Sequence, residues 1–213
     1  MKILAFGASG NCGQHFVRLA AARGHSVTAV ARAGSRVDAA PNVSVVQGDV
    51  LDAAFVAGVI PGHDVVMSGL GIRYRHPWAA RQSPDDFISR ATTHIITGMH
   101  AAGVTRISVI SAAGIGDSRP VLNLPMRFLL AASNVGVAYA DLERVEQLLR
   151  TSGLDWQAVR PTTLTHKQAT GRVRRTERYP ATATIPREDV AAFMLEELER
   201  PTFSALTPMI TVT

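Results

Sequence analysis

Cysteine, lysine and long apolar runs are all scarce in this chain of 213 residues. Its single cysteine, Cys12, excludes an intramolecular disulfide and fits a reducing compartment. No uncharged apolar run approaches the roughly 20 residues that a membrane-spanning helix requires. The first predicted strand begins at residue 2, which leaves no room ahead of it for a signal peptide. We therefore expect a cytoplasmic protein without a membrane segment.

The scarcity of lysine changes what the net charge of +5 means. Only Lys2 and Lys167 occur, so nearly all of the 22 basic residues are arginines. These arginines are scattered along the chain instead of forming one stripe, which argues against a nucleic-acid partner. The seven histidines lack the spacing of metal ligands, so no metal site is expected. The expected partner is a small-molecule acceptor, while a protein partner or a second copy of the chain stays open.

Apolar runs of strand length alternate with longer stretches of helical periodicity. Strands are predicted at residues 2–6, 26–31, 43–47, 64–68, 106–111 and 155–160. Helices are predicted at residues 12–23, 83–102 (with Ser83 as the N-cap), 139–151 and 188–198. Strands that are apolar nearly throughout, with helices between them, are typical of a parallel sheet covered on both faces. We predict an α/β fold in one domain, residues 1–213: a Rossmann-type doubly wound parallel sheet, with residues 161–187 contributing to a small substrate lobe at the carboxyl edge.

The first predicted strand runs directly into a glycine-rich stretch, FGASGNCGQHF (residues 6–16). At a strand–helix joint, Gly7 permits a tight turn, Gly10 lets a diphosphate approach the main chain, and Gly13 lets the helix pack on the strand. The first amides of the helix then point at the phosphates, and the helix dipole adds attraction. The alternative is an ordinary sharp turn, but the parallel-sheet context favours a dinucleotide. The predicted contacts are Gly7, Ala8, Ser9, Gly10, Asn11, Cys12 and Gly13.

The stretch after the second strand, ARAGSR (residues 31–36), bears on which dinucleotide is bound. An acidic residue there would bond the ribose hydroxyls of NAD and repel a 2′-phosphate. This chain instead has Arg32, Ser35 and Arg36, with no carboxylate before Asp38. Because the planar fork of arginine suits a phosphate dianion, we predict NADP(H) in preference to NAD(H). The alternative is that both arginines are solvated surface charges.

The Gly-x-x-Gly-x-x-Gly spacing resembles that of the extended and atypical short-chain dehydrogenases/reductases, and later segments continue the likeness. These segments are VVQGDVLD (45–52), SGLG (68–71), SGLDWQAVRPTTL (152–164) and IPREDVAAFMLEEL (185–198). Within that superfamily the chain most resembles the NmrA-like group and the flavin reductase/biliverdin-IXβ reductase-like proteins. The resemblance implies a Rossmann fold and an NAD(P) cofactor. It also implies further cofactor contacts at Asp49, Val50, Gly69, Leu70, Gly71, Pro161, Thr162 and Thr163.

Two residues have both a functional and a structural interpretation. Ser111, at the end of the fifth strand, matches the serine that the resemblance places beside nicotinamide and substrate, and it is the predicted catalytic residue. Its alternative role is to cap the turn at residues 112–114. Asp49, which the resemblance places beside the adenine, could instead cap the helix that starts near Asp52.

The proton relay of ketone-reducing members of this superfamily is missing. Those members carry a Tyr-x-x-x-Lys pair, whereas the corresponding segment here is YADLE (139–143). Glu143 cannot lower the pKa of Tyr139 as a lysine would, so we interpret Tyr139 as a half-buried helix residue. We predict an NADPH-dependent oxidoreductase that transfers hydride to a flavin, quinone or tetrapyrrole-like acceptor without a Tyr–Lys relay. The alternative is a non-catalytic NADP-sensing regulatory protein of the NmrA-like type.

Three further features keep alternatives open. Cys12 either fits as a small side chain beside the cofactor or senses redox state, since a helix start favours the thiolate. The basic stretch GRVRRTERY (171–179) either clamps acidic groups of a substrate or is a solvated strand or loop. The apolar stretch LNLPMRFLLAA (122–132) is a lid over the pocket, a core-covering helix or a subunit contact.

Overall fold

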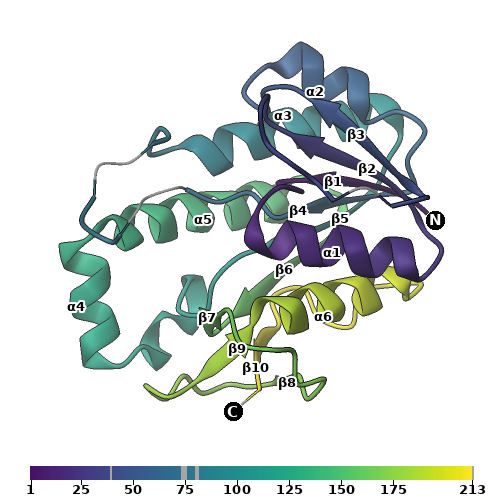
Figure 1. Ribbon diagram of the computed structural model, residues 1–213. Helices are drawn as coiled ribbons and strands as arrows, with labels where there is room; N and C mark the ends of the chain where they lie inside the picture. The colour runs from purple at the N-terminus through teal and green to yellow at the C-terminus, as the bar shows by residue number, and fades with distance from the viewer. Residues whose placement is uncertain (39, 73–75, 80–81, 213) are drawn as a thin grey trace.

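The computed structural model describes residues 1–38, 40–72, 76–79 and 82–212. Eight strands form one sheet in the order β3-β2-β1-β4-β5-β6-β10-β8, and only β8 runs antiparallel to its neighbour (Figure 1). The predicted doubly wound α/β fold is therefore confirmed. The strands are β1 (Lys2–Phe6), β2 (Ser26–Ala31), β3 (Val43–Gln47), β4 (Val65–Ser68), β5 (Arg106–Ile110), β6 (Asp155–Pro161), β8 (Arg174–Arg175) and β10 (Met209–Thr211).

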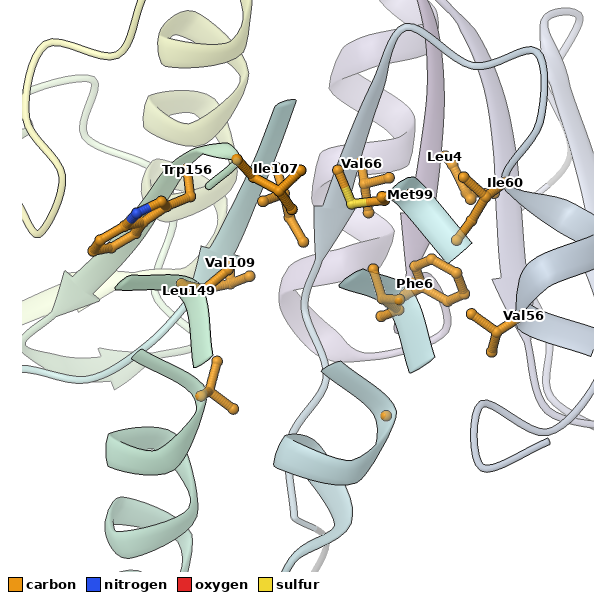
Figure 2. Packing of buried hydrophobic residues seen from close by; sticks show 14 of the residues in the cluster. Leu4, Phe6, Val56, Ile60, Val66, Met99, Ile107, Val109, Leu149 and Trp156 are labelled. Atoms are coloured by element: carbon orange, nitrogen blue, oxygen red, sulfur yellow. The ribbon is translucent and has the colours of Figure 1, made fainter. Parts of the chain in front are cut away.

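Helices cover both faces of this sheet, as its apolar strands require. Helices α1 (Asn11–Ala22) and α6 (Arg187–Glu199) lie side by side on one face (Figure 1). The other face is covered by α2 (Ala53–Val59), α3 (Phe87–Ala102) and α5 (Asn134–Thr151). Each face has its own buried cluster of side chains. Figure 2 shows part of the cluster under α2, α3 and α5. The strand residues Leu4, Phe6, Val66, Ile107, Val109 and Trp156 lie beside Val56, Ile60, Met99 and Leu149.

The start of α3 differs from the prediction, because a carboxylate from another helix caps it. The helix begins at Phe87 instead of near Ser83. Asp141, which is fully buried on α5, accepts hydrogen bonds from the Ile88 amide at 2.7 Å and from the Ser89 hydroxyl at 2.5 Å. A negatively charged group at the N-terminus of a helix also interacts favourably with the helix dipole. The N-terminus of α3 is therefore set by a residue more than 50 positions along the chain.

Helix α5 begins five residues before its predicted start at Tyr139. Ser133 is its N-cap and accepts a hydrogen bond from the Val135 amide at 3.3 Å. The first turns contain Gly136 and two valines, which have low helix propensity. The sequence pattern therefore did not predict this part of the helix.

Two irregular regions complete the fold. A 3-10 helix, η1 (Gly116–Val121), leads into α4 (Leu124–Ala132), which covers most of the apolar stretch 122–132. None of the α4 residues, all of which are described, is buried, but Met126 and Leu130 pack against a small buried cluster that contains Leu122 and Tyr179. A separate two-stranded sheet joins β7 (Thr163–Thr165) and β9 (Thr184–Pro186). Among the described residues, no helix has the length and apolar character needed to cross a bilayer.

Candidate functional site

The strand order reverses between β1 and β4, and a cleft opens at this edge of the sheet. Its volume is about 830 Å³, within the range of roughly 300–1,000 Å³ common for small-molecule sites. In doubly wound folds, ligands bind beyond the carboxyl ends of the strands at such a reversal. Helices α4 and α5 form its far wall with Met126, Leu129, Val135, Ala138, Tyr139 and Leu142.

The glycine loop forms one end of the cleft and leaves the start of α1 uncapped. Gly10, the N-cap of α1, has no side chain with which to accept hydrogen bonds from the first amides of the helix. Its own amide donates to the carbonyl of Gly7 at 2.9 Å, which closes the turn. Gly7 has a φ of +73°, and a Cβ there would lie 2.7 Å from the Gly69 carbonyl group. The first amides of α1 and its dipole are thus available to an anion.

Gly13 has the packing role that its position predicts. A Cβ at this residue would lie 2.2 Å from the Gly7 carbonyl oxygen and 2.9 Å from the Ala8 Cα. Real Cβ atoms do not approach backbone so closely, so only glycine lets α1 pack against the end of β1 at this distance.

Most of the predicted cofactor residues line the cleft, although their contacts with a cofactor remain predictions. Those that line it are Gly7, Ser9, Gly10, Asn11, Cys12, Arg32, Val50, Gly69, Leu70, Gly71, Pro161, Thr162 and Thr163, together with Ser111. Five predicted residues lie outside the lining. Ala8 and Gly13 are buried beneath the loop. Ser35, Arg36 and Asp49 are close in sequence to the lining residues Arg32 and Val50 but do not line the cleft themselves.

One interpretation of the sequence expected Asp49 to cap α2, but it does not. Its carboxylate accepts a hydrogen bond from the Leu51 amide at 2.9 Å. The cap of α2 is Asp52, whose carboxylate accepts from the amides of Ala54 and Phe55.

Ser111 is held by a buried ionic network that the sequence did not reveal. Its hydroxyl donates to Glu146 Oε1 at 2.7 Å, and the same carboxylate accepts from Arg160 Nε at 2.9 Å and Nη2 at 2.6 Å. Arg160 Nη1 in turn donates to Asp117 at 2.5 Å. Arg160 and Glu146 are only 2% and 3% exposed. Arg160, which follows Ala158 and Val159 near the end of β6, was the only signal of this pairing in the sequence.

This network decides what Ser111 offers to the cleft. A hydroxyl has one proton and two lone pairs. Because the proton is directed to Glu146, Ser111 faces the cleft as an acceptor. Ser111 does not cap the turn at residues 112–114, where the Gly114 amide donates to Ser118 Oγ at 2.9 Å instead.

The charges of the network are stabilised by one another. Burial opposes the charge on Arg160, but hydrogen bonds to Glu146 and Asp117 outweigh it and raise the pKa of the guanidinium above its ordinary value. The hydrogen bond from Arg160 lowers the pKa of Asp117. Arg160 is therefore a fixed positive charge behind Ser111.

The structure favours the first of the two interpretations of Cys12, a small side chain at the cleft. Burial raises the pKa of its thiol to about 11, although Arg187 acts weakly in the opposite direction. The neutral thiol is 8% exposed. Cys12 is therefore a small buried side chain at the cleft and lacks the exposed thiolate of a redox sensor.

The structure also places the apolar stretch 122–132 and the basic stretch 171–179 relative to the cleft. Helix α4 contributes Met126 and Leu129 to the wall of the cleft, which agrees with the lid interpretation. The basic stretch 171–179 contains the short exposed edge strand β8, where Arg175 pairs with Glu197 at 3.4 Å. Only Tyr179 of this stretch lines the cleft, with its hydroxyl 2.9 Å from Thr163 Oγ1. None of the arginines in this stretch lines the cleft, which favours a solvated strand or loop over a substrate clamp.

The cleft is positively charged. Its described lining contains two arginines, Arg32 and Arg187, and no carboxylate or lysine. Arg187 lies in the motif 185–198 but was not singled out by the sequence. Tyr139 is half-buried on α5, as expected, and lies on the cleft wall as well. No group of three or more potential metal ligands occurs among the residues that the structure describes.

Comparisons with known proteins identify relatives of this chain. A family model described as NAD(P)H-binding matches residues 7–201. The uncharacterized protein YwnB of Bacillus subtilis is 28% identical over 169 residues, which cover 76% of this chain and 71% of YwnB. ChuY, an anaerobilin reductase from Escherichia coli O157:H7, is 27% identical, with a TM-score of 0.79 over 99% of this chain and 96% of that one. A short-chain dehydrogenase/reductase from Veillonella parvula, solved with NADP, shares the fold at 14% identity, with a TM-score of 0.79 over 98% of this chain and 93% of that one.

Proposed function

Because this chain belongs to the NAD(P)H-binding family of atypical short-chain dehydrogenases/reductases, we propose that it is an NADPH-dependent reductase of a large conjugated acceptor, of the flavin, quinone or tetrapyrrole class. The observation that carries this proposal is the two-sided cleft. One end consists of glycine backbone and a free helix start, and the other is an apolar wall from α4 and α5. The first suits a diphosphate and the second suits a flat, largely apolar molecule.

The preference for NADPH rests on Arg32. It lines the cleft just after β2, where a dinucleotide in a Rossmann fold places its adenosine ribose. A guanidinium there attracts a 2′-phosphate, and no described carboxylate in the lining opposes it.

The bound NADPH would supply the hydride, and the residues of this chain would hold the two reactants face to face. Met126, Leu129 and Leu142 would pack against the acceptor and exclude water. Ser111, whose proton is held by Glu146, would accept a hydrogen bond from an N–H group of nicotinamide or acceptor. The proton that completes the reduction would come from solvent, since no lysine lines the described cleft to activate Tyr139. The anaerobilin reductase among the relatives supports the tetrapyrrole class.

We expect the purified protein to oxidise NADPH when a flavin, a quinone or biliverdin is supplied, and not when a simple ketone is supplied. Loss of NADPH absorbance measures the rate, and the ketone is the matched control because its reduction requires the missing relay. A protein that binds NADPH tightly but reduces no member of the panel would contradict the proposal. That result would instead support the NADP-sensing alternative.

Replacing Arg32 with aspartate should weaken NADPH binding by roughly 10- to 100-fold, since a hydrogen bond to a charged group contributes about 1.5–3 kcal/mol. NADH has no 2′-phosphate, and its affinity should change much less. Titration of intrinsic fluorescence gives both dissociation constants. Arg174→Asp, on the exposed edge strand, is the matched control and should alter neither. An equal loss of affinity for the two coenzymes would remove Arg32 from the 2′-phosphate site.

A further inference from the structure

Arg187 is a charged residue of the cleft lining whose guanidinium is not fully paired by the residues that the structure describes. It is the first residue of α6, and its side chain lines the cleft. The Nη1 atom is buried and makes no hydrogen bond. No ion pair links its guanidinium to any residue that the structure describes. A buried N–H group of a cation is rarely left in this state, because the lost hydration is not replaced.

The two acidic residues that follow Arg187 are both engaged elsewhere. Glu188 forms an ion pair with Arg18 on α1. The carboxylate of Asp189 accepts hydrogen bonds from the Thr170 amide at 2.8 Å and the Gly171 amide at 3.0 Å. These contacts hold the start of α6 against α1 and the loop at residues 170–171, so they hold Arg187 in position without neutralising its charge.

The surroundings of Arg187 indicate where its partner would lie. Its guanidinium is close enough to Cys12, in the first turn of α1, to lower the pKa of that thiol against the effect of burial. That first turn also has the unbonded helix amides of the glycine loop. The unbonded Nη1 of Arg187 and the free amides of α1 thus lie near one another at the cleft.

We propose that Arg187 binds an anionic oxygen of the ligand in this cleft, and that this oxygen belongs to the diphosphate of the dinucleotide. Arginine donates to phosphate through a fixed fork, and the start of α1 beside it is the place where a Rossmann fold holds a diphosphate. Arg187 and the glycine loop would then hold the diphosphate from two sides. A carboxylate on the acceptor has the same chemistry and is the competing source. The inference rests on the proposed function only in that a dinucleotide occupies the glycine loop.

Calorimetric titration of Arg187→Gln with three ligands tests this assignment. NADPH and 2′-phospho-ADP-ribose both carry the diphosphate, whereas 2′-AMP carries neither of its phosphates. We expect the first two to bind roughly 10- to 100-fold more weakly and 2′-AMP to bind as before. Arg187→Lys keeps the charge and should recover part of the loss. Arg172→Gln, an exposed arginine outside the cleft, is the matched control and should bind all three normally.

The melting temperature of the unliganded variant separates binding from a structural role. Removing a cation that has one buried, unbonded N–H group and no described ion pair should leave the melting temperature of Arg187→Gln unchanged or raise it. A lowered melting temperature with unchanged affinities would overturn the inference. Unchanged NADPH affinity with a raised KM only for acceptors that carry carboxylates would overturn the diphosphate assignment and give the anion to the acceptor. Wild-type protein that binds NADPH but reduces no acceptor would refute the proposed function and leave the role of Arg187 intact.

Discussion

Adding one methyl group at Gly13 should cost this protein most of its affinity for the dinucleotide. The Cβ of Gly13→Ala would lie 2.2 Å from the Gly7 carbonyl oxygen, which belongs to the backbone and cannot rotate away. Helix α1 must therefore move from the end of β1, at a strain of about 1–3 kcal/mol. The same movement displaces the first amides of α1, so we expect NADPH to bind roughly 100-fold more weakly. Thermal unfolding and a fluorescence titration measure the two effects.

Gly58→Ala is the matched control for this substitution. Gly58 lies within α2, and a Cβ there would meet nothing within 4 Å. Alanine is favoured over glycine in a helix interior by about 0.5–1 kcal/mol, so this variant should be slightly more stable and bind NADPH normally. Normal NADPH binding by Gly13→Ala would show that the loop does not hold the coenzyme in the way we propose.

Replacing Glu146 with alanine should give the largest loss of stability. Arg160 is 2% exposed and would keep only Asp117 as a partner for its charge. Removing one member of a buried ion pair typically costs about 3–5 kcal/mol, because the other charge stays buried without compensation. For a domain of this size the melting temperature should fall by roughly 6–20 °C. Chemical denaturation gives the free energy of unfolding directly.

A second variant and a control make the interpretation of Glu146→Ala specific. Glu146→Gln keeps the shape and one acceptor oxygen, so its loss of stability should be smaller. Glu143→Ala changes a partly exposed carboxylate on the same helix and should alter the free energy of unfolding by less than about 0.5 kcal/mol. If Glu146→Ala loses no more than Glu143→Ala, the buried network does not contribute to folding as we infer.

The sequence determined the elements whose residues are neighbours along the chain. The runs of β1, β2 and β3 are mostly apolar, and the boundaries of all three strands were predicted correctly. The glycine spacing likewise predicted the joint at Gly7, Gly10 and Gly13, since backbone sterics act over a few residues. Burial periodicity and backbone freedom are local properties, and local sequence contains them.

Tertiary structure decided the contacts between residues that are far apart along the chain. Asp141 sets the start of α3, and Glu146 directs the hydroxyl of Ser111, although neither partner is near it in sequence. The apolar wall of the cleft and the incompletely paired Arg187 become visible only when α4, α5 and α6 are packed around the sheet. A side chain's hydrogen-bond partner depends on distance in space, and a linear pattern of residue types does not contain that distance.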